Sequence, residues 1–117
     1  MILGLVDDLF FTAKIHAAAL QCGAAVAFSS QADDLMGTAL SQHPSLILVD
    51  LAKDSLAPIQ TIQRLKKDER LRHIPVLGFY PHVQTGLKDR ALNAGCDKVI
   101  PRSTFSQNLA KILMEGI

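Results

Sequence analysis

The chain has 117 residues, of which 49% are hydrophobic and 20% are charged, and its formal net charge is +1. This length suits a single domain over residues 1–117 with a core of its own, and the near-neutral charge argues against nucleic acid or an anionic membrane as the main partner. The apolar stretches are too short to span a membrane, and Asp7 and Asp8 interrupt the first of them, so we expect no signal peptide. Cys22 and Cys96 lack the spacing of a metal or redox motif, which suits a reducing compartment and predicts a cytoplasmic protein.

The first part of the chain alternates short apolar runs with segments of helical period. Residues 2–6 predict a strand, and the helix after it ends at Gly23, a typical terminator. Residues 24–28 predict a second strand. Ser30 begins a pattern that resembles a capping box and opens a second helix, and His43 ends that helix because it precedes a proline. The apolar face of the first helix consists of Phe11, Ile15, Ala18, Ala19 and Cys22.

The same alternation continues to the end of the chain. Pro58 suits the first turn of a third helix, residues 81–86 predict a loop, and Gly95 ends a fourth helix that follows this loop. Ser103 is the predicted cap of the last helix. The remaining strands are predicted at residues 46–49, 76–80 and 98–100.

Five strands that alternate with helices predict an α/β domain with a parallel sheet and helices on both of its faces. Five such units fit the flavodoxin-like, doubly wound (βα)5 order 2-1-3-4-5. In that order the strand at residues 2–6 lies beside the strand at residues 46–49. The carboxyl ends of these two strands then meet at the edge where such sheets bind ligands.

Acidic residues follow both of these strands. Asp50 ends the run Leu46-Ile47-Leu48-Val49, whose four apolar residues suit the middle of a sheet, and Asp7 and Asp8 follow the first strand. Three carboxylates that converge repel each other unless a cation lies among them. Two interpretations stay open for Asp7 and Asp8, because carboxylates also favour the N-terminus of a helix.

Four segments together carry a resemblance to a known family, and it extends over nearly the whole chain. In this order, they resemble a response-regulator receiver domain: Leu5-Val6-Asp7-Asp8, Leu46-Ile47-Leu48-Val49-Asp50, His73-Ile74-Pro75-Val76-Leu77 and Ala94-Gly95-Cys96-Asp97-Lys98-Val99-Ile100-Pro101-Arg102.

The resemblance implies a site and a function. It makes Asp50 the candidate phosphoacceptor, with Mg²⁺ held by Asp7, Asp8, Asp50 and the backbone carbonyl of Ala52. A hard divalent cation prefers such oxygens and neutralises charge in phosphoryl transfer. The chain would then be a single-domain receiver in two-component phosphorelay signalling and not an enzyme. Its expected partners are a sensor histidine kinase or phosphotransfer protein, and a downstream protein that docks on the fourth helix, fifth strand and fifth helix, residues 87–114.

Several positions depart from the family pattern. Tyr80 stands where receivers carry Ser or Thr as a phosphoryl partner, Arg102 replaces a Lys, and Val99 occupies the aromatic switch position. Arg102 suits a bidentate, standing pair with Asp50, and Lys53 adds a second cation near the acidic residues. These departures favour an alternative, a pseudo-receiver that is not phosphorylated and acts as a constitutive protein-interaction module. For Tyr80, packing and function both stay open.

An enzyme or cofactor carrier on the same fold is a further alternative, and each variant of it conflicts with particular residues. A flavodoxin needs a phosphate-binding loop after the first strand, where Asp7 and Asp8 would repel a phosphate. A phosphatase with an aspartyl nucleophile often has a second acid two residues later, where this chain has Ala52. A cobalamin carrier would need a histidine ligand in an early loop, and the sequence has none there.

Overall fold

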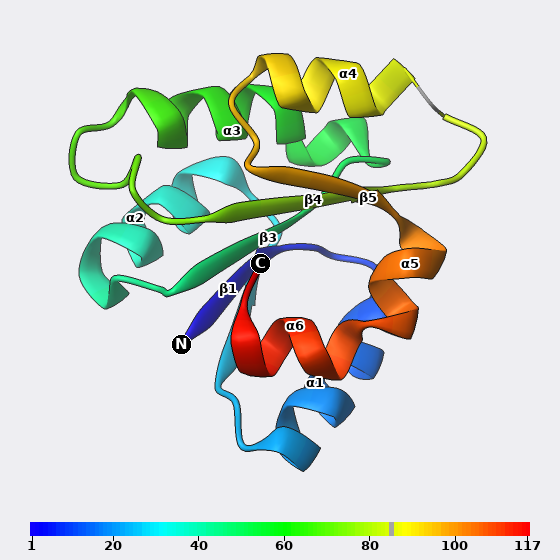
Figure 1. Ribbon diagram of the computed structural model, residues 1–117. Coiled ribbons are helices and arrows are strands. Elements are labelled where there is room, and N and C mark those ends of the chain that lie inside the picture. Colours follow the sequence, from blue (N-terminus) through cyan, green and yellow to red (C-terminus); the bar gives the residue numbers. More distant parts are fainter. Residues whose placement is uncertain (85) are drawn as a thin grey trace.

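The structure, a computed structural model, describes residues 1–84 and 86–117 (Figure 1). Over these residues five parallel strands form one sheet in the order β2-β1-β3-β4-β5. This is the predicted flavodoxin-like order, so the predicted fold is confirmed. The strands are β1 (Ile2–Leu5), β2 (Val26–Ser29), β3 (Leu46–Asp50), β4 (Val76–Tyr80) and β5 (Lys98–Pro101).

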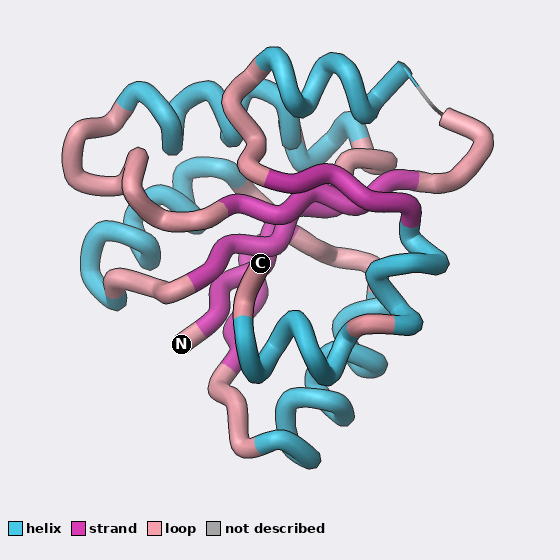
Figure 2. The backbone as a smooth tube through the Cα atoms, in the orientation of Figure 1, coloured by secondary structure: helices cyan, strands magenta, loops and turns pink. Residues whose placement is uncertain are grey.

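Helices cover both faces of the sheet (Figures 1 and 2). The three helices α2 (Ala32–Gln42), α3 (Pro58–Lys67) and α4 (Gly86–Asn93) lie along one face, and a short 3₁₀ turn, η1 (Asp54–Leu56), precedes α3. The other face carries α1 (Leu9–Cys22), α5 (Arg102–Gln107) and α6 (Leu109–Glu115). Among the described residues, no helix has the length and apolarity needed to cross a membrane.

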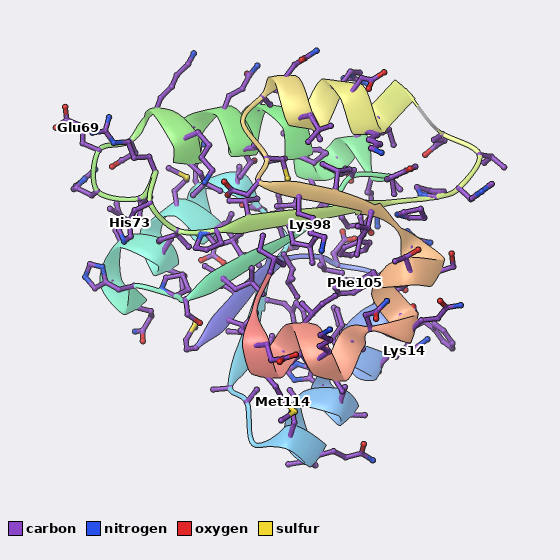
Figure 3. The ribbon with its side chains drawn as sticks, in the orientation of Figure 1. Lys14, Glu69, His73, Lys98, Phe105 and Met114 are labelled. Atoms are coloured by element: carbon purple, nitrogen blue, oxygen red, sulfur yellow. The ribbon has the colours of Figure 1, made fainter. Side chains whose placement is uncertain are left out.

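The sheet separates two apolar cores, because successive side chains of a strand point to opposite faces. On β3, Ile47 and Val49 pack with α2, α3 and α4, whereas Leu46 and Leu48 pack with α1, α5 and α6. All five residues of β3 are buried, as predicted for a central strand. Phe105, labelled in Figure 3, is fully buried in the second core, while Met114 on the same side of the molecule is 68% exposed.

Several helix ends lie where local chemistry predicts them. Gly23 ends α1 in the left-handed conformation, with φ 73°, which a residue without a Cβ adopts at little cost. His43 ends α2, also in the left-handed region, with φ 49°. Pro58 is in the first turn of α3, where the missing N–H costs no hydrogen bond.

Other predicted boundaries are wrong. The predicted capping box at Ser30 does not open α2, because the N-cap residue is Gln31, in an extended conformation. Ser103 does not cap the last helix either. The chain turns from β5 directly into α5, so that Pro101 is the N-cap residue, and the predicted single helix is divided into α5 and α6 at Asn108. The predicted loop 81–86 includes residue 85, which lies outside the described residues.

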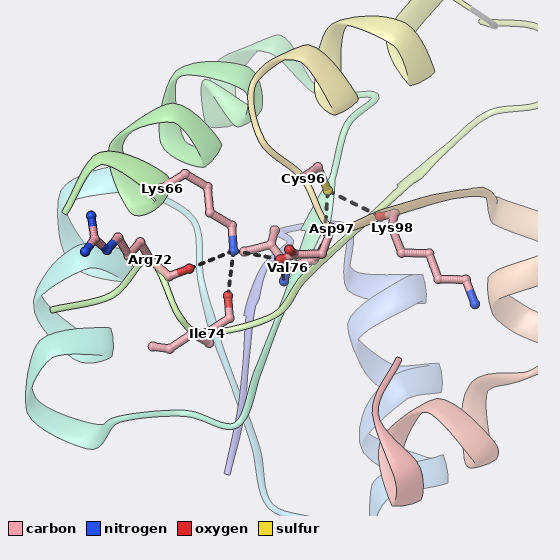
Figure 4. Close-up of polar contacts among 7 residues, drawn as sticks. All are labelled: Lys66, Arg72, Ile74, Val76, Cys96, Asp97 and Lys98. Carbon is pink, nitrogen blue, oxygen red and sulfur yellow. Dashed lines mark hydrogen bonds and ion pairs between the residues drawn. The ribbon is translucent and has the colours of Figure 1, made fainter. Parts of the chain in front are cut away.

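The end of α3 is tied to the sheet by a cluster of polar contacts that we call the Lys66–Asp97 network (Figure 4). The ammonium of Lys66 donates to Oδ2 of Asp97 at 2.7 Å and to the carbonyl oxygens of Ile74 at 2.9 Å and Arg72 at 3.2 Å. Asp97 also accepts a hydrogen bond from the backbone N–H of Val76 at 2.8 Å. The network therefore joins α3 to the starts of β4 and β5, at the sheet edge opposite Asp50.

Candidate functional site

The predicted acidic residues meet at the carboxyl ends of β1 and β3. β1 pairs directly with β3, with Leu5 beside Val49, so Asp50 and the Asp7-Asp8 pair leave the sheet side by side. They border an open depression of about 560 Å³, which we call the acidic depression. Its lining residues are Asp7, Asp8, Leu9, Phe10, Asp50, Ala52, Lys53 and Arg102.

Asp50 is the buried member of the group, with 2% of its surface exposed. Its Oδ1 accepts a hydrogen bond from the backbone N–H of Ala52 at 3.0 Å and lies 3.5 Å from Nη2 of Arg102. Burial raises the pKa of Asp50 above its ordinary value, and the Ala52 N–H and the Arg102 charge oppose that rise. A carboxylate in this position is held in place and partly neutralised by the chain itself.

Arg102 faces Asp50 differently from the expected bidentate pair. Within the described part of the chain, the structure gives this pair a single contact, at the long limit of a hydrogen bond, so the bidentate geometry is wrong. The guanidinium is instead fixed from its other side, with its carbon 5.0 Å from the centroid of the Phe11 ring, a cation–π distance. Phe11 in turn stacks on Phe79 at 5.1 Å and on Phe105 at 5.8 Å.

The two acids after β1 have different roles. Asp8 is the N-cap residue of α1, where its side chain accepts a hydrogen bond from the N–H of Phe11 at 3.1 Å. The helix-capping interpretation is therefore confirmed for Asp8. Asp7 pairs with Lys53, whose Nζ lies 2.8 Å from Oδ1 of Asp7. This contact raises the pKa of the Lys53 ammonium, which is itself well exposed.

Tyr80 and Val99 lie outside the acidic depression. Both belong to the core cluster under α2, α3 and α4, and neither is among the described residues that line the acidic depression. Gly78 pairs with Val99 across β4 and β5, so Tyr80, two residues further, points to the same face as Val99. The packing interpretation of Tyr80 fits this position. Its role as a phosphoryl partner, and that of Val99 as a switch, stay predictions.

Two residues of the depression were not predicted from the sequence. Leu9 and Phe10 rim it and are 84% and 80% exposed, which is unusual for large apolar side chains. The sequence does contain a signal for them. They directly follow Asp8, and they do not belong to the apolar helix face that starts with Phe11 and Ile15.

The chain is similar to known proteins in both sequence and structure. No protein-family model matches the chain. It is 32% identical over 69 residues to the polar-differentiation response regulator DivK of Brucella ovis, which covers 59% of this chain and 56% of the relative. The chain thus matches little more than half the length of this curated relative. Among solved structures, a response regulator from Hahella chejuensis superposes with a TM-score of 0.87 at 15% identity, covering 99% of this chain and 93% of that one.

The chain has a receiver-domain fold. The predicted resemblance to response-regulator receiver domains is confirmed by both comparisons. A further structural neighbour is the receiver domain of the sensor histidine kinase PA1611 from Pseudomonas aeruginosa, with a TM-score of 0.82 and 20% identity over 97% of this chain and 93% of that one. That receiver domain has a magnesium ion coordinated in its active-site cleft.

The acidic depression of the present receiver fold does not fit a divalent cation in the same way. Asp7 is already paired with Lys53, and the side chain of Asp8 is used to cap α1. Over residues 1–84 and 86–117, no group of three histidine, cysteine or acidic side chains is arranged to hold a metal ion. The predicted ligand role of the Ala52 carbonyl stays a prediction; what the structure gives is the N–H of Ala52 bound to Asp50.

Proposed function

We propose that this chain is a receiver module of two-component signalling that acts by docking to other proteins, with its acidic site neutralised by its own side chains instead of by phosphorylation. One observation carries the proposal: the two acids that do not cap a helix, Asp7 and Asp50, each face a cation of the chain. Asp7 faces Lys53, and Asp50 faces Arg102. On this proposal the chain is not an enzyme, and the cytoplasm remains its predicted location.

The position of Arg102 supports this reading. Arginine stays charged at any physiological pH and stacks well on aromatic rings, and here its guanidinium rests on Phe11 at the edge of an aromatic stack. A side chain held in this way keeps a positive charge beside Asp50 in the resting protein. Tyr80 supports the same reading, because its ring is buried in the core under α2, α3 and α4.

The surface expected to dock partners is that of α4, β5 and the α5–α6 segment. Four polar side chains of this surface are exposed, together with the apolar Leu92, at 43%, and Met114, at 68%. A sensor histidine kinase, a phosphotransfer protein or a downstream response protein is the expected class of partner. The polar residues are Lys88, Arg90, Gln107 and Lys111.

A second candidate function is that of a working phosphoacceptor, and the position of Asp50 favours it. Asp50 is the last residue of the central strand and borders an open depression at the edge of the sheet, where ligands bind in folds of this kind. In this function the Asp50 carboxylate attacks the phosphorus of a phosphohistidine, and the histidine leaves as the phosphoryl group is transferred.

Intact-mass spectrometry separates the two candidates. The wild-type protein, Asp50→Asn and a matched exposed control, Asp89→Asn, are each incubated with acetyl phosphate and Mg²⁺. The proposal expects no added phosphoryl mass on any of the three proteins. An adduct on wild type and Asp89→Asn that is absent from Asp50→Asn would instead establish the phosphoacceptor. In partner capture, the proposal expects equal recovery with wild type and Asp50→Asn, and lower recovery when Lys88 and Arg90 are both changed to Ala.

A further inference from the structure

We infer that Lys53, together with Arg102, takes the place of a divalent cation at the acidic depression, so that the resting protein is independent of Mg²⁺. The inference rests on the proposed function, since it names what neutralises the site. It also goes further, because it assigns a role to a loop lysine and predicts a metal affinity that changes when this lysine is removed.

Lys53 is placed for this role by the loop that follows β3. Its ammonium crosses from that loop to Asp7 beyond β1, at 2.8 Å, and its charge also interacts with those of Asp8 and Asp50. A single ammonium therefore lies within electrostatic reach of all three carboxylates. A cation in this position reduces their mutual repulsion.

The other two carboxylates already have partners within the chain, each through its Oδ1 oxygen. Asp50 receives the Ala52 N–H and the charge of Arg102 on the same oxygen, Oδ1. Asp8 uses its side chain to cap α1. The three carboxylates are thus met by two cations of the chain and by the N-terminus of a helix. An incoming metal ion would have to displace Lys53 from Asp7 and then remain beside two positive charges.

Arg102 and Lys53 differ in how firmly the protein holds their charges in place. Arg102 is held by the Phe11 ring and by the aromatic residues beneath it, so its charge stays in place when Asp50 changes its partners. The Lys53 side chain is 49% exposed, and within residues 1–84 and 86–117 its ammonium is paired with Asp7 alone. Lys53 is therefore the cation whose removal opens the depression to a metal with the least disturbance of the fold.

The test is isothermal titration calorimetry with Mg²⁺ at constant ionic strength. Four proteins are compared: wild type, Lys53→Ala, Lys53→Arg and Lys14→Ala. Lys14→Ala removes the same charge from an exposed position on α1 that is not among the residues lining the depression. Circular dichroism and thermal unfolding verify that each variant is folded.

Removal of one positive charge next to a divalent ion strengthens its binding by about tenfold. We therefore expect Lys53→Ala to bind Mg²⁺ about tenfold more tightly than wild type, whereas Lys14→Ala and Lys53→Arg stay close to wild type. Equal Mg²⁺ affinities for wild type and Lys53→Ala would overturn the inference. So would a Lys14→Ala variant that gains as much affinity as Lys53→Ala, because the effect would then belong to net charge and not to the position of Lys53.

The failure of this inference and that of the proposed function give different results. A phosphoryl adduct at Asp50 of the wild-type protein removes the proposed function, whatever the calorimetry shows. An unchanged Mg²⁺ affinity on removal of Lys53 removes only the inference, because Asp50 can still lack an adduct in the mass experiment.

Discussion

The guanidinium of Arg102 lies between a carboxylate and an aromatic ring: Nη2 is 3.5 Å from Oδ1 of Asp50, and the guanidinium carbon is 5.0 Å from the centroid of the Phe11 ring. The candidate site is thereby joined to the apolar core, since Phe11 stacks with Phe79, and Phe79 stacks with Phe105 at 4.5 Å. The position of the Arg102 charge that faces Asp50 thus depends on the packing of the aromatic rings beneath Arg102.

Phe11→Ala is expected to lower stability and to release Arg102. Phe11 is 6% exposed, and loss of a buried phenyl ring costs about 3–5 kcal/mol in the free energy of unfolding. Urea denaturation measures this loss. The neighbouring Phe10→Ala is the control, because Phe10 is 80% exposed and its removal is expected to change stability by no more than about 0.5 kcal/mol. Similar losses for both variants would contradict the packing described for Phe11.

Asp50→Asn is expected to stabilise the protein at neutral pH. Because burial raises the pKa of Asp50 in the folded state, the charged carboxylate is less favourable in the folded protein than in the unfolded chain. This penalty is absent below the ordinary pKa of 3.8 and grows as the pH rises from there through the raised pKa. Asparagine carries no such penalty. We expect a higher Tm for Asp50→Asn at pH 7, and a difference that shrinks as the pH falls toward 3.8.

Thermal unfolding of wild type, Asp50→Asn and the exposed control Asp89→Asn between pH 3 and pH 8 measures this dependence. The control is expected to follow the wild-type curve. If Asp50→Asn were less stable than wild type at pH 7, the attraction of Arg102 for Asp50 would outweigh the cost of burial.

Lys66→Met is expected to weaken the attachment of α3 to the sheet and so to lower the stability of the protein. The substitution keeps an apolar stem of similar length but removes the ammonium that three oxygens share in the Lys66–Asp97 network. Polar groups left without a partner each cost about 1–3 kcal/mol when they are buried. These oxygens are only partly shielded from water, so we expect a total loss of about 1–3 kcal/mol in the free energy of unfolding.

The matched control is Lys67→Met. Lys67 is the next residue of α3 and is exposed, and its substitution is expected to have an effect within about 0.5 kcal/mol. Hydrogen exchange gives an independent measure, because the N–H of Val76, which donates to Asp97, is expected to exchange faster in Lys66→Met. Unchanged exchange at Val76 would show that Asp97 keeps its position without the lysine.

Gly4→Ala and Gly37→Ala are expected to change stability in opposite directions. A Cβ at Gly4 on β1 would lie 2.8 Å from Cδ1 and 2.9 Å from Cε1 of Phe28. Overpacking of this kind costs about 1–3 kcal/mol. At Gly37, inside α2, a Cβ meets nothing within 4 Å, and Ala in a helix interior is better than Gly by about 0.5–1 kcal/mol. Chemical denaturation of both variants measures the contrast. A stabilised Gly4→Ala would show that Phe28 moves aside without cost.

Much of this fold follows from short-range chemistry that a sequence displays. The buried run before Asp50 predicts the central strand, and Gly23 and Pro58 mark an end and a start of helices, because each of these signals acts within a few residues. The sheet order follows from strand–helix alternation together with its fit to the flavodoxin-like pattern. Convergence of Asp7, Asp8 and Asp50 then follows from the sheet order alone.

The parts that were mispredicted depend on contacts between distant segments. Ser30 and Ser103 have suitable side chains for caps, but the chain enters α2 and α5 at Gln31 and Pro101. The guanidinium of Arg102 lies over the Phe11 ring, and in this position it makes a single long contact with Asp50. Sequence spacing does not show that a residue of α1 will lie beneath a residue that follows β5.

The division of the C-terminal segment at Asn108 has a consequence for how the molecule can respond to a partner. Arg102 begins α5, which has only 6 residues, and the backbone at Asn108, with φ −109° and ψ 15°, separates it from α6. Contacts between α6 and α1 anchor the chain beyond that point. A binding protein that moves α5 to carry the guanidinium away from Asp50 must therefore also withdraw Phe105 from the core, because this residue of α5 is fully buried and stacks on Phe79.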